Sequence, residues 1–215
     1  MTMDFRKTFF LILFFMSGFC NLTYEIVWVR MLNLVFGVTV FAVSAVVASF
    51  MLGMALGAIG FGDIIDKSNN RPHLFSLCHF GIGAAAIAIV LAFPWLQGLY
   101  LSVNHLLHPD FYAMRVLLFF LSLVLLVIPT TIMGATFPLA TRILAANEEG
   151  LGSNIGVLYG ANTLGGVLGC SVTVFFILGP AGMKGTIYIA AIVDCAIGLA
   201  ALAHANTSLR GRTSQ

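Results

Sequence analysis

Six long apolar stretches follow one another along the chain and leave only short polar segments between them. A helix needs about 20 mostly apolar residues to cross the roughly 30 Å hydrocarbon core of a bilayer, and it satisfies its own backbone hydrogen bonds there. We predict six membrane spans at about residues 8–32, 39–61, 74–93, 112–139, 154–178 and 185–204. The expected fold is therefore an all-α, polytopic membrane protein over residues 1–205, followed by a polar C-terminal tail at 206–215.

Charged residues are scarce: Asp, Glu, Lys and Arg make up 8% of the 215 residues, and apolar residues make up 60%. Soluble domains have about 25% charged residues. This composition excludes a soluble enzyme and a nucleic-acid-binding protein with a basic surface, and it makes the lipid bilayer the expected partner. The four cysteines lie in apolar runs without paired spacing, so we expect no disulfide framework, no metal site and no cofactor.

The start of the chain has two features of a signal peptide, because Arg6 and Lys7 precede an apolar run. The run is too long for such a peptide, and no small-residue cleavage site follows before Glu25 and Trp28. We interpret this segment as a retained first helix.

The distribution of Lys and Arg predicts the orientation, because these residues accumulate on the cytoplasmic side. With six spans, most basic residues fall on the side of the N-terminus: Arg6, Lys7, Lys67, Arg71, Arg142, Arg210 and Arg212. The other side has Arg30, Arg115 and Lys184. We therefore expect a multi-pass protein of the cell (inner) membrane with both termini in the cytoplasm. Residues 95–111 lack Lys and Arg, and we place them at the opposite interface with Trp95 and Tyr100 as anchors.

A polar segment between the second and third spans contains Gly62, Asp66, Lys67 and Arg71. This spacing resembles the cytoplasmic loop motif of the major facilitator superfamily, although two asparagines replace a glycine and a basic residue. In that interpretation the glycine permits a close helix contact, and Asp66 bonds a helix end or an arginine of another helix. An ordinary positively charged cytoplasmic loop explains the same residues.

A longer succession of motifs extends over residues 10–185. In order, these are Tyr24-Glu25-Ile-Val-Trp28-Val-Arg30, Phe36-Gly37-x-Thr39, Phe50-Met-x-Gly53-x-Ala55-Leu56-Gly57, Met133-Gly134-Ala135-Thr136-Phe137-Pro138 and Tyr159-Gly160-Ala161-Asn162-Thr163-Leu164-Gly165. Taken in this order they resemble the membrane domain of the fused major-facilitator/spermidine-synthase proteins. The resemblance implies a six-helix, half-facilitator bundle.

In that family, the bundle is often followed by an aminopropyltransferase-like domain. Here the sequence stops about ten residues after the last predicted span and contains no glycine-rich strand-to-helix turn. We therefore expect no enzyme activity in this chain and assign no catalytic residue. A separate synthase-like protein remains an expected partner.

Glu25 and Asp194 are acidic residues within predicted spans, where ionisable groups are costly and suggest function. Glu25 either faces a central cavity that binds a cation, a proton or an amine, or pairs with Arg30 at the membrane interface. Asp194 lies mid-span, where an unpaired carboxylate costs about 2.5–3.5 kcal/mol. It must be protonated or paired, and the candidate partners are Asn162, Thr163 and His79. A proton or cation site and a structural hydrogen bond both fit Asp194, and His79 taken alone fits a packed polar residue.

Three pairs of glycines have the small-x-x-x-small spacing that lets helices approach closely in membranes. They are Gly53 with Gly57, Gly156 with Gly160, and Gly165 with Gly169. They either pack helices inside one bundle or form a homodimer interface.

Two functions remain open from the sequence. The first is a transporter-like half-facilitator that handles a cationic amine or a proton-coupled small solute, and that works as a homodimer or with another membrane subunit. The second is a non-transporting membrane anchor or scaffold for a synthase-like or other partner.

Overall fold

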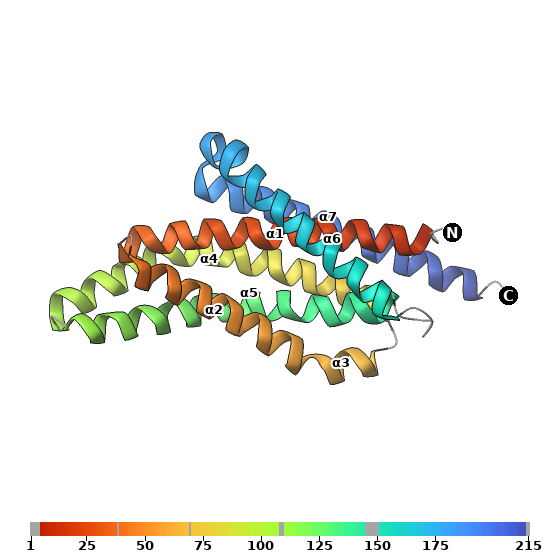
Figure 1. The fold of residues 1–215 in the computed structure, drawn as a ribbon, viewed down its shortest axis with the longest axis horizontal. Helices are drawn as coiled ribbons and strands as arrows, with labels where there is room; N and C mark the ends of the chain where they lie inside the picture. Colours follow the sequence, from red (N-terminus) through yellow and green to blue (C-terminus); the bar gives the residue numbers. More distant parts are fainter. Residues whose placement is uncertain (1–4, 38, 69, 108–109, 145–150, 214–215) are drawn as a thin grey trace.

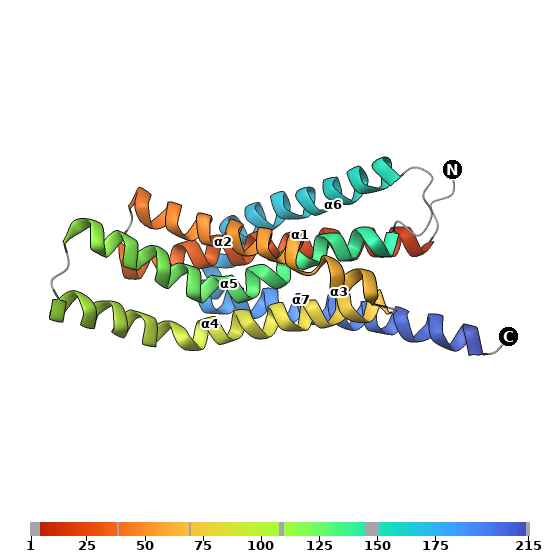
Figure 2. The same ribbon diagram turned by 90° about the horizontal axis from the view of Figure 1, so that it is seen from below.

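The computed structural model describes residues 5–37, 39–68, 70–107, 110–144 and 151–213. All regular structure in these ranges is helical. The elements are α1 (Phe5–Phe36), α2 (Val40–Gly60), α3 (Gly62–Lys67), α4 (Arg71–Leu107), α5 (Phe111–Leu144), α6 (Leu151–Val172), the short π-helix η1 (Thr173–Ile177) and α7 (Leu178–Thr213). The long helices extend along one axis, and α1 begins at the end of the bundle where α7 finishes (Figures 1 and 2).

Five helical segments are long and apolar enough to cross a membrane: Lys7–Phe36, Val40–Gly60, Arg71–His105, Tyr112–Leu144 and Gly152–Ala205. The last has 54 residues. Gly182 interrupts it with φ 67° and ψ 178°, in a region of backbone conformation that glycine tolerates. Figure 1 shows the chain reversing direction between α6 and α7. The predicted fifth and sixth spans are thus two arms of this segment, and the break at Gly182 lies in the gap predicted between them.

The predicted end of the third span at Pro94 is wrong, because α4 continues through Pro94 to Leu107. An internal proline removes one helix hydrogen bond and costs about 3 kcal/mol. Tertiary contacts favour the continuation: the ring of Tyr100 packs against Phe36 with centroids 5.0 Å apart, and Leu96 packs on the core. The segment predicted as an interfacial loop is therefore mostly helix.

Glycines bring pairs of helices into backbone contact. A Cβ atom added at Gly53 or Gly57 of α2 would meet Thr130 or Thr131 of α5. Gly165 and Gly169 of α6 lie in the same way against the backbone of α1. The first and third predicted pairs therefore pack helices inside the bundle.

The second predicted pair behaves differently. A Cβ atom at Gly156 or Gly160 would meet no other atom within 4 Å. These two glycines of α6 therefore make no close backbone contact of the kind seen at the other two pairs.

Helices α1, α2 and α4 are related to α5, α6 and α7 by a regular pattern of contacts. The packing of α2 on α5 corresponds to that of α6 on α1, and α4 with α5 corresponds to α7 with α1. The remaining pair, α4 with α7, corresponds to itself. Each helix of the second set runs opposite to its counterpart in Figure 1, so the two sets have inverted topology.

The sequences of the two sets can also be aligned residue by residue. Equivalent residues are 112 positions apart, as Gly53 and Gly165 are. The sequence Leu52-Gly53-x-x-Leu56-Gly57 recurs as Leu164-Gly165-x-x-Leu168-Gly169. Buried residues recur at the same spacing. Buried pairs are Phe14 and Leu126, Asn21 and Met133, Tyr24 and Thr136, Val27 and Leu139, Phe75 and Ile187, Cys78 and Ala190, His79 and Ala191, and Ile82 and Asp194. The chain is therefore an inverted repeat of two three-helix units.

We predict that Gly57→Ala destabilises the protein, because the added methyl group overlaps the backbone oxygen of Thr131. Overpacking of this kind typically costs about 1–3 kcal/mol. The measurement is the thermal unfolding temperature of the detergent-purified protein. Gly160→Ala is the matched control, since it adds the same group where no atom lies within 4 Å, and it should not lower this temperature. Equal stability of the two variants would contradict the observed contact between α2 and α5.

Candidate functional site

Tyr24 of α1 and His79 of α4 meet Asp194 of α7, so three ionisable side chains from three helices lie together. The hydroxyl group of Tyr24 on α1 donates a hydrogen bond to Oδ2 of Asp194 at 2.8 Å. Nδ1 of His79 on α4 lies 2.8 Å from Oδ1. Both carboxylate oxygens therefore have a partner, each from a different helix.

The cluster of Tyr24, His79 and Asp194 is sealed by aromatic side chains. All three residues have 0% exposure. The ring of Trp28 stacks on Tyr24 with centroids 5.3 Å apart, and Phe75 packs on His79 at 4.6 Å. Nε2 of His79, inside the cluster, is buried without a hydrogen-bond partner among the described residues. The same holds for Nε1 of Trp28, which packs against the cluster.

Of the three candidate partners for Asp194, the structure brings only His79 to it. The side-chain amide of Asn162 donates instead to the backbone oxygen of Phe14 at 3.2 Å, so it joins α6 to α1. The hydroxyl group of Thr163 donates to Tyr159 of its own helix at 2.8 Å.

Tyr24 is the residue that the sequence analysis missed. From the sequence, Tyr24 is only one residue of a motif. A linear sequence does not show which residue of a distant helix contacts an aspartate. The available signal was periodicity. Ser17, Asn21, Tyr24 and Trp28 recur at intervals of four, three and four residues, which places polar atoms along one buried face of α1.

Next to Tyr24, the hydroxyl groups of Thr23 and Thr173 are 2.8 Å apart. Thr173 begins the π-helix η1, and single π-turns inside helices occur frequently at functional sites. This contact joins the irregular segment to the helix that contributes Tyr24.

Glu25 is half-buried on α1 and does not belong to the cluster. No ion pair joins it to Arg30 in the part of the chain that the structure describes. The interfacial Glu25–Arg30 pair considered from the sequence is therefore not formed.

The predicted loop motif forms a short helix, α3, rather than an irregular turn. Asp66 lies 2.9 Å from Nη2 of Arg142 at the end of α5. Asp66 thus bonds an arginine of another helix, which is one of the two roles considered for it. Lys67 is exposed beside it, and Nε of Arg71 is buried without a hydrogen-bond partner among the described residues.

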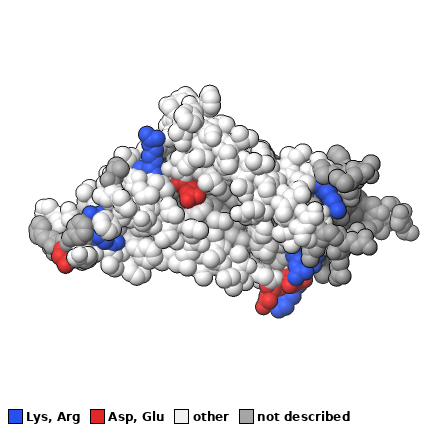
Figure 3. All heavy atoms as spheres, viewed as in Figure 1, with Lys and Arg blue, Asp and Glu red and all other residues white. Residues whose placement is uncertain are grey.

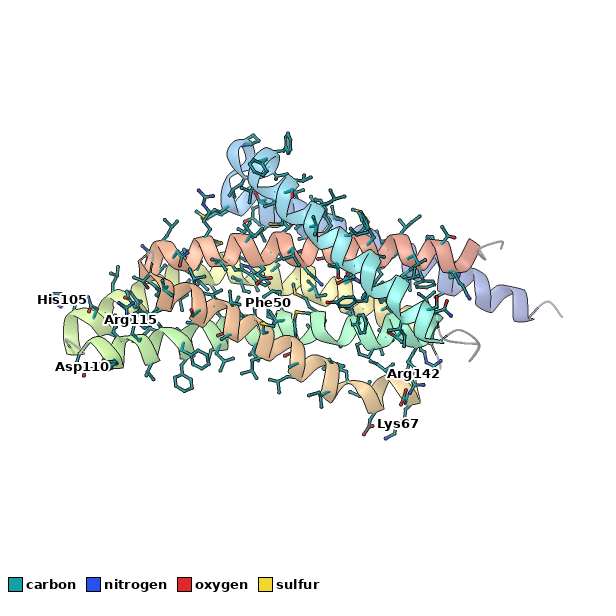
Figure 4. All side chains as sticks on the ribbon, viewed as in Figure 1. Phe50, Lys67, His105, Asp110, Arg115 and Arg142 are labelled. Atoms are coloured by element: carbon teal, nitrogen blue, oxygen red, sulfur yellow. The ribbon has the colours of Figure 1, made fainter. Side chains whose placement is uncertain are left out.

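Charged side chains gather toward the two ends of the long axis, and most of the described surface between them is uncharged (Figure 3). Lys67 and Arg142 lie at the end where α1 begins, and His105, Asp110 and Arg115 lie at the opposite end (Figure 4). Arg115 donates a hydrogen bond to Oγ1 of Thr39 at 3.2 Å and lies over the ring of Phe41. This distribution fits helices whose central parts contact lipid.

A cavity of about 520 Å³ lies between α4 and α5. Its lining is apolar and includes Ala85, Ala92, Trp95, Leu121 and Ile128. Within the described ranges, no three His, Cys, Asp or Glu side chains are grouped to hold a metal ion.

In comparisons with known proteins, no family model, no curated protein and no solved structure matches this chain. The buried cluster of Tyr24, His79 and Asp194 is therefore the basis on which a function is proposed, together with the inverted repeat.

We predict that Tyr24→Phe destabilises the protein by about 1–3 kcal/mol, because Oδ2 of the buried Asp194 loses its donor. Thermal unfolding of the purified protein measures the change. Tyr159→Phe removes the same hydroxyl group from a side chain that is 63% exposed, and should leave stability unchanged. Unfolding of Tyr24→Phe at the wild-type temperature would contradict the hydrogen bond to Asp194.

Proposed function

We propose that this protein is half of a facilitator-like membrane transporter that completes its pathway with a second copy of itself or with another membrane subunit. The observation that carries the proposal is the inverted repeat of three helices. Many secondary transporters are built from such repeats, and six-helix halves of major facilitators contain two nested three-helix repeats. The resemblance of residues 10–185 to the membrane domain of the fused major-facilitator/spermidine-synthase proteins supports the same fold.

The buried cluster of Tyr24, His79 and Asp194 supports transport rather than simple anchoring. Ionisable residues within membrane spans are rare and typically mark substrate or ion pathways. Glu25 adds a half-buried carboxylate on α1. Since the ionisable groups of this interior are mainly acids, the substrate class that we propose is a cationic amine or a small solute that moves with protons.

The proposed orientation places both termini in the cytoplasm of a multi-pass protein of the cell membrane. The end of the bundle with Lys67 and Arg142 then faces the cytoplasm, in agreement with the excess of Lys and Arg expected there. Asp66 and Arg142 would join α3 to α5 at this surface.

The transport proposal predicts that uptake depends on Asp194. The purified protein is reconstituted in liposomes, and uptake of radiolabelled spermidine is measured with and without a pH gradient. Asp194→Asn should abolish uptake and Glu25→Gln should reduce it, because each removes a carboxylate that we place on the pathway. Asp66→Asn is the control, since Asp66 lies in the exposed α3–α5 contact, and it should retain uptake.

The oligomeric state in mild detergent tests the same proposal. We expect two copies per particle, or one copy with a second membrane protein. A strict monomer without a partner would contradict a transporter made of two halves.

The second candidate function is a scaffold for a synthase-like or other protein, and the apolar cavity between α4 and α5 favours it. The cavity between α4 and α5 has an apolar lining and offers no ligand to a cation. A scaffold would tolerate Asp194→Asn in function. It would lose its co-purifying partner when Gly160 is replaced by leucine, since a Cβ atom at Gly160 meets no other atom of the bundle within 4 Å.

A further inference from the structure

We propose that Tyr24, His79 and Asp194 form a proton-binding site in which His79 and Asp194 together hold one proton while α1, α4 and α7 are packed. The proton enters from water and returns to water when these helices separate. This inference rests on the proposed transport function for its use, but the binding of the proton is a property of the cluster alone.

The first argument is the charge balance of the site. An unpaired carboxylate inside an apolar bundle is costly, and a charge there must be neutralised by a partner or by a proton. Asp194 has 0% exposure, and its partners among the described residues are the hydroxyl group of Tyr24 and Nδ1 of His79. A hydroxyl group carries no positive charge. The site is therefore neutral only when the pair holds one proton more than a neutral His79 imidazole and an ionised Asp194 carboxylate.

The second argument concerns the other groups around the cluster. On α1, the thiol of Cys20 points to the backbone oxygen of Ala190 at 3.7 Å, one helical turn before Asp194. On α7, Cys195 follows Asp194 directly in the sequence. On α4, Cys78 precedes His79. All three are thiols, and none supplies a positive charge. His79 is thus the basic group of the site.

The third argument comes from the inverted repeat. The positions equivalent to Tyr24, His79 and Asp194 are Thr136, Ala191 and Ile82, which are all buried. The packing of this bundle is therefore achieved at the equivalent place without any ionisable side chain. The three ionisable residues thus occupy only one of two equivalent places in the bundle. Packing alone does not require ionisable residues there, whereas a proton site does.

The geometry also links the proton to the position of the helices. Each of the three residues belongs to a different helix, so the carboxyl group of Asp194 loses both hydrogen-bond partners when α7 moves away from α1 and α4. Water then solvates both charges separately, and the site no longer favours the neutral, protonated state. Nε2 of His79 is buried without a hydrogen-bond partner in the described structure, so it is the nitrogen atom at which the proton can exchange with water once the helices separate.

The experiment is infrared spectroscopy of the purified protein at pH 7 in H₂O and D₂O. In His79→Gln no base remains, so the proton must lie on Asp194 itself. We expect the C=O stretching band of a protonated carboxylic acid that shifts in D₂O. The double variant His79→Gln/Asp194→Asn should lose this band. The control His79→Gln/Glu25→Gln should retain it, since Glu25 lies outside the cluster.

Absence of the band in folded His79→Gln would overturn the proposal, because Asp194 would then be ionised without a basic partner. So would a band that disappears with Glu25 rather than with Asp194. If His79→Gln does not fold, the dependence of thermal stability on pH in the wild type and in Asp194→Asn decides.

Under this proposal, packing of the cluster takes up one proton, which the water-exposed groups of the unfolded chain do not hold at neutral pH. The folded state then binds more protons than the unfolded state, so stability should fall as pH rises above neutral. The folding equilibrium constant should decrease by up to about tenfold per pH unit in the wild type. Asp194→Asn should lose this dependence and Glu25→Gln should keep it. Identical profiles for the wild type and Asp194→Asn would overturn the proposal.

These measurements need no substrate, so they separate this site from the proposed transport function. A titrating pair in a protein without uptake rejects transport and leaves the proton site. Uptake by a protein whose His79–Asp194 pair does not hold a proton rejects the site and leaves transport.

Discussion

The carboxylate of Asp194 can lie in the interior of this bundle only because two other helices supply it with polar partners. Tyr24 of α1 and His79 of α4 occupy both of its oxygens, each at 2.8 Å. A helix has 3.6 residues per turn, so a shift of one residue in the register of any of the three helices would turn the group away by about 100°. The cluster therefore fixes the rotation of α1, α4 and α7 about their axes, which general hydrophobic packing does not.

Glycines fix the distances between the helices, as the cluster fixes their rotation. In lipid, apolar side chains do not drive helices together, so close backbone contact contributes more than in water. Gly57 allows α2 to approach α5, and Gly169 allows α6 to approach α1 in the equivalent way. The two contacts are copies of one arrangement, and they place α4 and α7 on each other between the two units. The position of Asp194 beside His79 follows from this crossing.

The sequence predicted the helical class and the approximate segments, because long apolar stretches leave few alternatives. It failed at Pro94, where the contact between Tyr100 and Phe36 stabilises a helix that local rules would end. It identified Asp194 and offered His79 among three partners, but the choice depends on how α4 and α7 cross. The repeat of Leu-Gly-x-x-Leu-Gly was present in the sequence, yet two short matches carry weight only when burial recurs at the same spacing.

Gly156 and Gly160 of α6 can be interpreted with the same repeat. Gly156 and Gly160 correspond to Ser44 and Ala48 of α2, so small residues face outward at equivalent places on both peripheral helices. The inward pairs are already occupied by α1 and α5, and the outward ones lack a contact in this bundle. Small residues at a helix surface in lipid allow another helix to approach closely. A second half that binds this protein would find such a surface on both α2 and α6, and the internal symmetry relates the two surfaces.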